Sequence, residues 1–324
     1  MPCVKRAVIV VGAVLAVGML SSGCTDEPVG PKPSAVQLAL DKSEDLGARI
    51  LTSQRIPLHG DIAHYTYDVA VGPGQYDVIR LHRIVRERRP DTPVPTKDAL
   101  FLLPGAPNYF EAIFVEPLIS QAVAWDRSIA VFLAQNDIDV WGMDYSWALV
   151  PAEVTDLDFM RGWGLQRDID QTDEALYLAR SIRSSTGQGL KKLNLLGFSY
   201  GGFVAYAIAG RETQRPPGLR NVKGLVALDA GIKLGEESDR DFYCSALPVD
   251  QANLDAGVYS DDSGLLFELL GEWAVSAPND PSPIVEGLTN LQTALVVGAR
   301  TDLLTGQFWH FVGGDLDEYG ILPP

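Results

Sequence analysis

A short apolar run followed by a glycine-rich pentapeptide constrains this chain more than any other stretch. Residues 193–196 have the composition of a buried parallel strand, and the pentapeptide GFSYG at 197–201 follows at once. An apolar run with helical character then extends over 203–209. Glycines two residues before and after Ser199 remove side chains that would collide in a sharp strand-to-helix turn. The helix begins behind Ser199, so its free N–H groups can stabilise negative charge that develops there. The stretch therefore predicts an exposed, nucleophilic serine.

The pattern G-x-S-x-G between a strand and a helix resembles the nucleophile elbow of the α/β-hydrolase superfamily. The resemblance implies an α/β fold with a mostly parallel central sheet that is opened by an antiparallel hairpin. It also implies a cap-like insertion after the sixth strand, whereas an eighth strand has no evident counterpart here. The implied activity is that of a serine esterase or lipase, which forms an acyl-enzyme and needs no cofactor.

The segments around the pentapeptide follow the order that such a fold requires. Apolar and polar residues alternate over 65–71, and 76–85 returns as a second strand after the turn at 72–74, which predicts the hairpin. The arginines at the end of this second strand, Arg83 among them, are expected to be solvated. Further predicted elements are strands at 99–103, 138–145, 222–229 and 293–299 and an amphipathic helix at 165–185.

The turn after the strand at 99–103 has the sequence PGAP at 104–107. In the superfamily the corresponding turn supplies one N–H group of the oxyanion hole, and the residue after the nucleophile supplies the other. The resemblance therefore implies that the backbone N–H groups of Ala106 and Tyr200 are these donors, because Pro107 has no N–H.

In the α/β-hydrolase superfamily the acid and the base of the catalytic triad follow the serine in the chain, so the resemblance implies that order here. Asp302 lies just after the predicted seventh strand and is the favoured acid, and Asp229 at the end of the sixth strand is the alternative. Of the four histidines only His310 follows Asp302, and the interval between them is shorter than the superfamily normally has. Three interpretations stay open. His310 is the base, the triad histidine lies beyond residue 324, or the fold has lost catalysis.

The N-terminal segment has the pattern of an export signal. Positive Lys5 and Arg6 precede an uncharged, mostly apolar run over 7–20, which is typical of a signal peptide. LSSGC at 20–24 resembles a bacterial lipoprotein cleavage box and implies lipidation of Cys24, although an ordinary secretory signal or an N-terminal anchor is the alternative. The chain is therefore predicted to consist of a signal peptide at 1–23, a flexible tether at 24–35, and a hydrolase domain at 36–324 with a cap-like insertion at 231–290.

Charge and cysteine content narrow the functional classes further. A formal net charge of −16 disfavours binding to nucleic acid. Of the three cysteines, Cys244 is the one that would remain unmodified in the exported body, and it is expected to be a buried apolar residue. Zinc and nucleotide motifs are absent, and His59 and His64 are spaced poorly for a metal clamp, so no metal site is expected.

The sequence thus predicts an exported serine hydrolase, lipid-anchored through Cys24 to the periplasmic or extracellular face of a bacterial membrane. Its partners would be that membrane and a small-molecule or lipid ester, which Ser199 attacks. The alternatives are a non-catalytic lipoprotein that binds a ligand or partner, and an acyltransferase, which would use the same residues with another acceptor.

Overall fold

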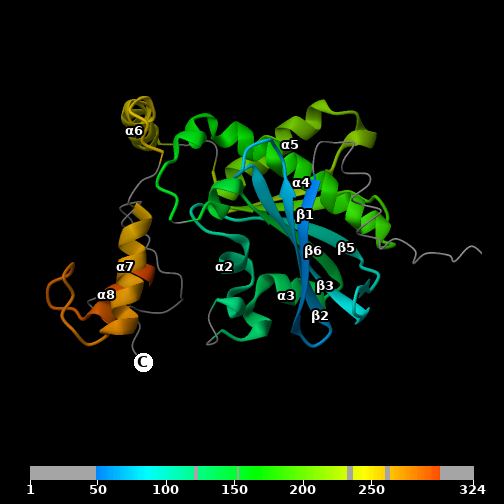
Figure 1. Cartoon of the computed structure of the whole chain (residues 1–324), viewed down its shortest axis with the longest axis horizontal. Helices are drawn as coiled ribbons and strands as arrows, with labels where there is room; N and C mark the ends of the chain where they lie inside the picture. Colours follow the sequence, from blue (N-terminus) through cyan, green and yellow to red (C-terminus); the bar gives the residue numbers. More distant parts are fainter. Residues whose placement is uncertain (1–48, 120–122, 152, 232–235, 260–262, 300–324) are drawn as a thin grey trace, which may run out of the picture.

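The structure is a computed structural model (Figure 1). It describes residues 49–119, 123–151, 153–231, 236–259 and 263–299. The predicted signal peptide and tether lie outside the described residues, as do Cys24, Asp302 and His310.

A mixed β-sheet forms the centre of the molecule. Its strand order is β1-β2-β3-β6-β5-β7-β8, with the short β4 paired to β3. Strands β1, β2, β3 and β6 pair antiparallel, whereas β6, β5, β7 and β8 pair parallel. The strands are β1 (Arg49–His59), β2 (Ile62–Ala70), β3 (Val78–Arg89), β4 (Thr92–Pro93), β5 (Asp98–Leu103), β6 (Ile138–Asp144), β7 (Leu193–Phe198) and β8 (Val222–Leu228).

The predicted hairpin is confirmed as β2 and β3, but a further antiparallel strand, β1, precedes it. The described sheet is therefore mixed rather than mostly parallel. The predicted strands at 99–103, 138–145 and 222–229 correspond to β5, β6 and β8. Arg83 was expected to be solvated, which is wrong. Strand β3 continues to Arg89, so Arg83 lies inside it and is 1% exposed.

Helices cover both faces of the sheet (Figure 1). Helices α4 and α5 pack on one face, and α2 and α3 pack on the other. The α-helices are α2 (Phe110–Phe114), α3 (Ile129–Gln135), α4 (Leu165–Ser185), α5 (Tyr200–Gln214), α6 (Glu237–Asp255), α7 (Ser263–Ser276) and α8 (Asn290–Ala299). Short 3₁₀ helices span Glu116–Leu118, Trp125–Arg127, Ser146–Leu149, Asp158–Gly162 and Pro217–Leu219.

Local sequence explains helices α4 and α5, which cover one face of the sheet. In α4, Ile169, Leu176 and Ile182 recur at helical spacing and are buried against the sheet, as the amphipathic pattern predicted. Helix α5 begins directly after Ser199 and buries Val204 and Ile208 in the same core. The connection from β6 through α4 to β7 is a crossover between two parallel strands that lie on either side of β5.

The part of the chain after β8 is helical. Figure 1 shows α6, α7 and α8 on one side of the sheet, and α7 packs against α8. The predicted seventh strand at 293–299 is wrong, because these residues belong to α8. A short apolar run fits a buried strand or a buried helix equally well, and here it packs against another helix. Cys244 on α6 is exposed, so the expectation of a buried cysteine is also wrong.

Strand β8 is consequently the edge of the described sheet. Its apolar residues Val226 and Leu228 are 48% and 47% exposed. None of the helices in the described ranges is both long and apolar enough to cross a bilayer.

Candidate functional site

Ser199 occupies the turn between β7 and α5. Its φ of 50° and ψ of −119° lie outside the regions that L-residues ordinarily adopt. Two backbone hydrogen bonds hold the turn: the N–H of Ser199 donates to the carbonyl oxygen of Leu228 at 3.0 Å, and the N–H of Gly202 donates to the carbonyl oxygen of Ser199 at 2.8 Å. The side chain of Ser199 makes no capping hydrogen bond to α5 and is half-buried. Its hydroxyl is therefore not used to stabilise the helix.

The two glycines of the pentapeptide are required by close backbone approaches. A β-carbon on Gly197 would collide with the backbone of Gly201, and one on Gly201 would collide with the carbonyl oxygens of Leu103 and Pro104. A third glycine, Gly202, faces Ala230, which follows β8. The spacing of glycines around Ser199 is thus explained by the packing of the turn against the ends of β5 and β8.

The loop after β5 lies against the serine. A β-carbon on Gly105 would be 2.9 Å from Cβ of Ser199 and 3.2 Å from the Phe198 ring. The loop closes into a tight turn in which the N–H of Asn108 donates to the carbonyl oxygen of Gly105 at 2.9 Å. Within the part of the chain that the structure describes, neither the N–H of Ala106 nor that of Tyr200 donates a hydrogen bond.

The side chain of Tyr200 anchors the first turn of α5. Its hydroxyl donates to Oδ2 of Asp168 at 2.6 Å, and Nε1 of Trp147 donates to the same oxygen at 3.2 Å. The Tyr200 ring meets the rings of Tyr145 and Trp147 edge to face. Burial raises the pKa of Asp168, and burial together with the bond to Asp168 raises the pKa of Tyr200. The sequence pattern gave no indication of this role for Asp168, which is buried on α4.

Of the predicted acid and base residues, the described structure includes Asp229, whose chain neighbours Leu228 and Ala230 contact the turn at Ser199 and Gly202. Asp229 follows β8 directly, has a φ of 51° and is exposed. Asp302 and His310 lie outside the described residues. Of the described histidines, His59 stacks on Trp125, and His64 and His82 belong to a buried cluster in which His82 contacts Asp144.

Comparison with known proteins relates the chain to solved structures. No family model matches the chain, and no curated protein matches it. A candidate lipase from Sulfolobus solfataricus has a TM-score of 0.52 at 20% identity, over 77% of this chain and 70% of that chain. At that identity the likeness shows the fold alone.

Two further solved structures match less well. A cold-adapted esterase from an Arctic intertidal metagenomic library has a TM-score of 0.36 at 8% identity, over 53% of this chain and 62% of that chain. Esterase B from Lactobacillus rhamnosis has a TM-score of 0.32 at 14% identity, over 75% of this chain and 64% of that chain. The mixed sheet with helices on both faces, and its likeness to the Sulfolobus structure, are together consistent with an α/β-hydrolase fold.

Proposed function

We propose that this protein is an exported serine hydrolase that cleaves an ester, or a related acyl bond, with Ser199 as nucleophile. The observation that carries the proposal is the positive φ of Ser199, which lies in the turn between β7 and α5. Gly105 lies against the side chain of this serine. Strained backbone of this kind persists only where the surrounding structure enforces it, and it concentrates at functional sites.

The proposed reaction has two stages, acylation of Ser199 and hydrolysis of the acyl-enzyme. Oγ of Ser199 attacks the acyl carbon while a histidine takes its proton, and a tetrahedral oxyanion forms. The intermediate collapses to an acyl-enzyme as the histidine returns that proton to the departing alkoxide. Water then attacks the acyl-enzyme by the same steps, which releases the acid and restores the hydroxyl. An acyltransferase would differ only in accepting another alcohol in place of water.

The oxyanion would be stabilised by two backbone donors, the N–H groups of Ala106 and Tyr200. The supporting observations are that the loop containing Ala106 touches Ser199 through Gly105, and that neither N–H is engaged with another described residue. Tyr200 is also the first residue of α5, where N–H groups lack helical partners and the helix dipole is positive. One such donor typically contributes about 2.7–4 kcal/mol to transition-state stabilisation.

The base and the acid are proposed from chain order. His310 is the histidine that follows Ser199 in this sequence, and Asp302 would orient it, with Asp229 as the alternative acid. The acid fixes the tautomer of the imidazole and stabilises the imidazolium that forms. The position of Asp229 immediately after β8, whose Leu228 carbonyl holds the Ser199 backbone, keeps this alternative within the proposal.

A fluorophosphonate probe tests the proposal, because it reacts covalently only with an activated serine. We expect the full chain to be labelled and Ser199→Ala to abolish labelling. Ser181→Ala is the matched control, since the Ser181 hydroxyl only donates to the Tyr177 carbonyl oxygen on α4. Absence of labelling from a folded sample of these 324 residues would overturn the proposal that Ser199 is activated with His310 as its base. Two interpretations would then remain, a triad histidine beyond residue 324 and a non-catalytic binding protein.

The same probe distinguishes the proposed base and acid. His310→Gln should lose labelling almost completely, whereas His59→Gln should keep it. Whichever of Asp302→Asn and Asp229→Asn lowers the labelling rate by orders of magnitude identifies the acid, since such a change leaves the histidine in the wrong tautomer. If His310→Gln labels normally, His310 is not the base.

We also propose export and a lipid anchor on Cys24, which rest on the N-terminal sequence. Expression with radiolabelled palmitate should label the wild type, and Cys24→Ala should lose the label and move from the membrane fraction to the soluble fraction. Cys244→Ala is the control. A membrane-bound, unlabelled wild type would favour an uncleaved N-terminal anchor.

A further inference from the structure

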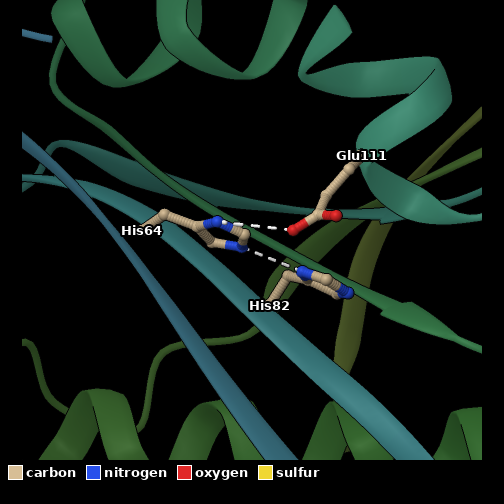
Figure 2. Close-up of side chains that lie close together, drawn as sticks. All are labelled: His64, His82 and Glu111. Carbon is tan, nitrogen blue, oxygen red and sulfur yellow. Dashed lines mark hydrogen bonds and ion pairs between the residues drawn. The ribbon is translucent and has the colours of Figure 1, made fainter. Parts of the chain in front are cut away.

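A buried chain of polar side chains runs across β2, β3 and β6, on the face of the sheet that α2 covers. Figure 2 shows its two histidines, His64 and His82. Nε2 of His82 lies 2.9 Å from Oδ2 of Asp144, and Nδ1 of His82 lies 2.9 Å from Nε2 of His64. Oδ1 of Asp144 also accepts the backbone N–H of Phe110 at 2.6 Å. Both imidazoles are almost fully buried, so each nitrogen must be satisfied within the protein.

The hydrogen bonds determine which nitrogen carries which proton. A carboxylate that already accepts a backbone N–H acts as an acceptor, so Nε2 of His82 donates to Asp144. In a neutral His82 the other nitrogen, Nδ1, is then an acceptor, and His64 must donate to it from Nε2. The two rings lie 5.1 Å apart with 16° between their planes, which suits an in-plane N–H···N bond. Nδ1 of His64 then carries a lone pair and no proton.

This lone pair faces a carboxylate. Nδ1 of His64 is buried and has no hydrogen-bond partner among the described residues, and Oε1 of Glu111 on α2 lies 3.7 Å from it (Figure 2). An N–H on Nδ1 would be expected to approach the carboxylate to about 2.7–2.9 Å. The observed gap instead leaves room for a third group between two electron-pair donors.

The gap has the size that a transition-metal cation requires. Bonds from zinc to histidine nitrogen and to carboxylate oxygen are about 2.0–2.2 Å, so two ligand atoms 3.7 Å apart subtend a bent angle of roughly 120–130° at the ion. His82 is not a direct ligand in this arrangement, because both of its nitrogens are engaged. It serves instead, with Asp144, to orient His64, as carboxylate–histidine pairs do behind metal sites.

The surroundings favour a cation and its water molecules. His64 and Glu111 line a cavity of about 140 Å³ whose wall also contains the polar side chains of Thr52, Gln54 and Thr66. Asp68 and Arg80, also in the wall, form a salt bridge at 2.7 Å and so offset each other's charge. Glu111 and Asp144 then leave the cluster with two negative charges.

We propose that Nδ1 of His64 and the carboxylate of Glu111 bind a divalent first-row transition metal, of the zinc type, with water completing the coordination sphere. The expectation of no metal site is not tested by the described structure. His59, which was considered as a partner of His64, stacks on Trp125 instead. The ion would tie α2 to β2. Because α2 begins shortly after the loop that contains Gly105, it would also fix that loop beside Ser199.

Titration of the metal-free full chain with ZnCl₂ tests the proposal without any assay of activity. We expect calorimetry to show one site that Glu111→Gln and His64→Gln each weaken at least tenfold, and Zn²⁺ to raise the melting temperature of the wild type but not of these variants. His59→Gln and Glu116→Gln are the matched controls and should bind as the wild type does. Glu111 is partly exposed, so its variant is informative even if His64→Gln fails to fold.

Two results would overturn the proposal. In the first, the folded wild type shows no Zn²⁺ binding at millimolar concentration, which would mean that the gap between His64 and Glu111 holds only water. In the second, Glu111→Gln binds Zn²⁺ as tightly as the wild type, which would mean that the ion binds elsewhere. Neither result bears on fluorophosphonate labelling of Ser199, so the two proposals fail independently.

Discussion

Gly105 and Ser199 lie so close that a β-carbon on the glycine would be 2.9 Å from Cβ of the serine. Residues from two separate strand ends, β5 and β7, therefore meet at one point, and the loop from β5 can pass over the serine only because residue 105 has no side chain. This contact connects the loop that contains Ala106 to the turn that exposes Ser199.

The first prediction concerns this contact. Gly105→Ala should push the loop away from Ser199 and Phe198, and we expect the rate of fluorophosphonate labelling to fall about tenfold or more, which corresponds to about 1.4 kcal/mol in activation free energy. Gly162→Ala is the control, because a β-carbon there would meet no atom within 4 Å. Unchanged labelling of Gly105→Ala would show that the loop does not contribute to the reactivity of the serine.

The second prediction concerns the elbow itself. The three atoms nearest to a β-carbon on Gly197 would be backbone atoms of Gly201 and Gly202, which cannot move aside as a side chain can. Gly197→Ala should therefore lower the free energy of unfolding by about 1–3 kcal/mol or more, or prevent folding. Gly210→Ala in α5 meets nothing and should instead stabilise by about 0.5–1 kcal/mol. Urea denaturation of both variants measures the difference, and equal stabilities would contradict the prediction.

A buried charge network gives the third prediction. Asp139 on β6 accepts hydrogen bonds from Arg83 at 2.8 and 2.9 Å and from Arg183 at 2.9 Å, and all three side chains are at most 2% exposed. Asp139→Asn should leave two buried guanidinium charges uncompensated and cost about 3–5 kcal/mol of stability.

The control for this network is Asp61→Asn. Asp61 pairs with Arg86 on the surface, with 51% of its side chain exposed, so its substitution should cost about 1 kcal/mol or less. Thermal unfolding monitored by circular dichroism compares the two variants. A small effect of Asp139→Asn would mean that the two arginines find other partners.

The fourth prediction is a pH dependence. Burial, with Asp170 and Asp173 nearby, raises the pKa of Glu174 from 4.5 to about 7 in the folded protein, and Oε2 of Glu174 lacks a hydrogen-bond partner among the described residues. A carboxyl whose folded pKa is raised favours folding when protonated, so its contribution is complete below about pH 4.5 and is lost as the pH rises through 7.

Glu174→Gln should therefore be more stable than the wild type above pH 7, and the difference should vanish below pH 4.5. Denaturant unfolding between pH 4 and 8 measures it, with the exposed Glu153→Gln as the control. A stability difference that is constant with pH would contradict the assignment.

Local sequence was sufficient to predict the turn at Ser199 and most strands of the sheet. The glycines around Ser199 constrain a turn whose clashes are mostly between near neighbours, such as Gly197 and Gly201, so the pattern predicts the geometry. Alternation over β2 and β3 predicted the hairpin, because exposure on one face and burial on the other follow from a period of two. The strand predicted at 293–299 was wrong, because a short apolar segment has no period that distinguishes a strand from a helix.

Only the tertiary structure determined the polar clusters. Arg83 and Asp139 are far apart in sequence and meet because β3 pairs with β6, and His82 meets Asp144 across the same pair. Asp168 on α4 becomes the acceptor of Tyr200 for a similar reason, because α4 and α5 pack on the same face. A buried charge is stable only when a partner from another element reaches it, and no sequence pattern specifies that partner. The sequence determined where a nucleophile could stand, and the packing of the sheet decided which charged groups surround it.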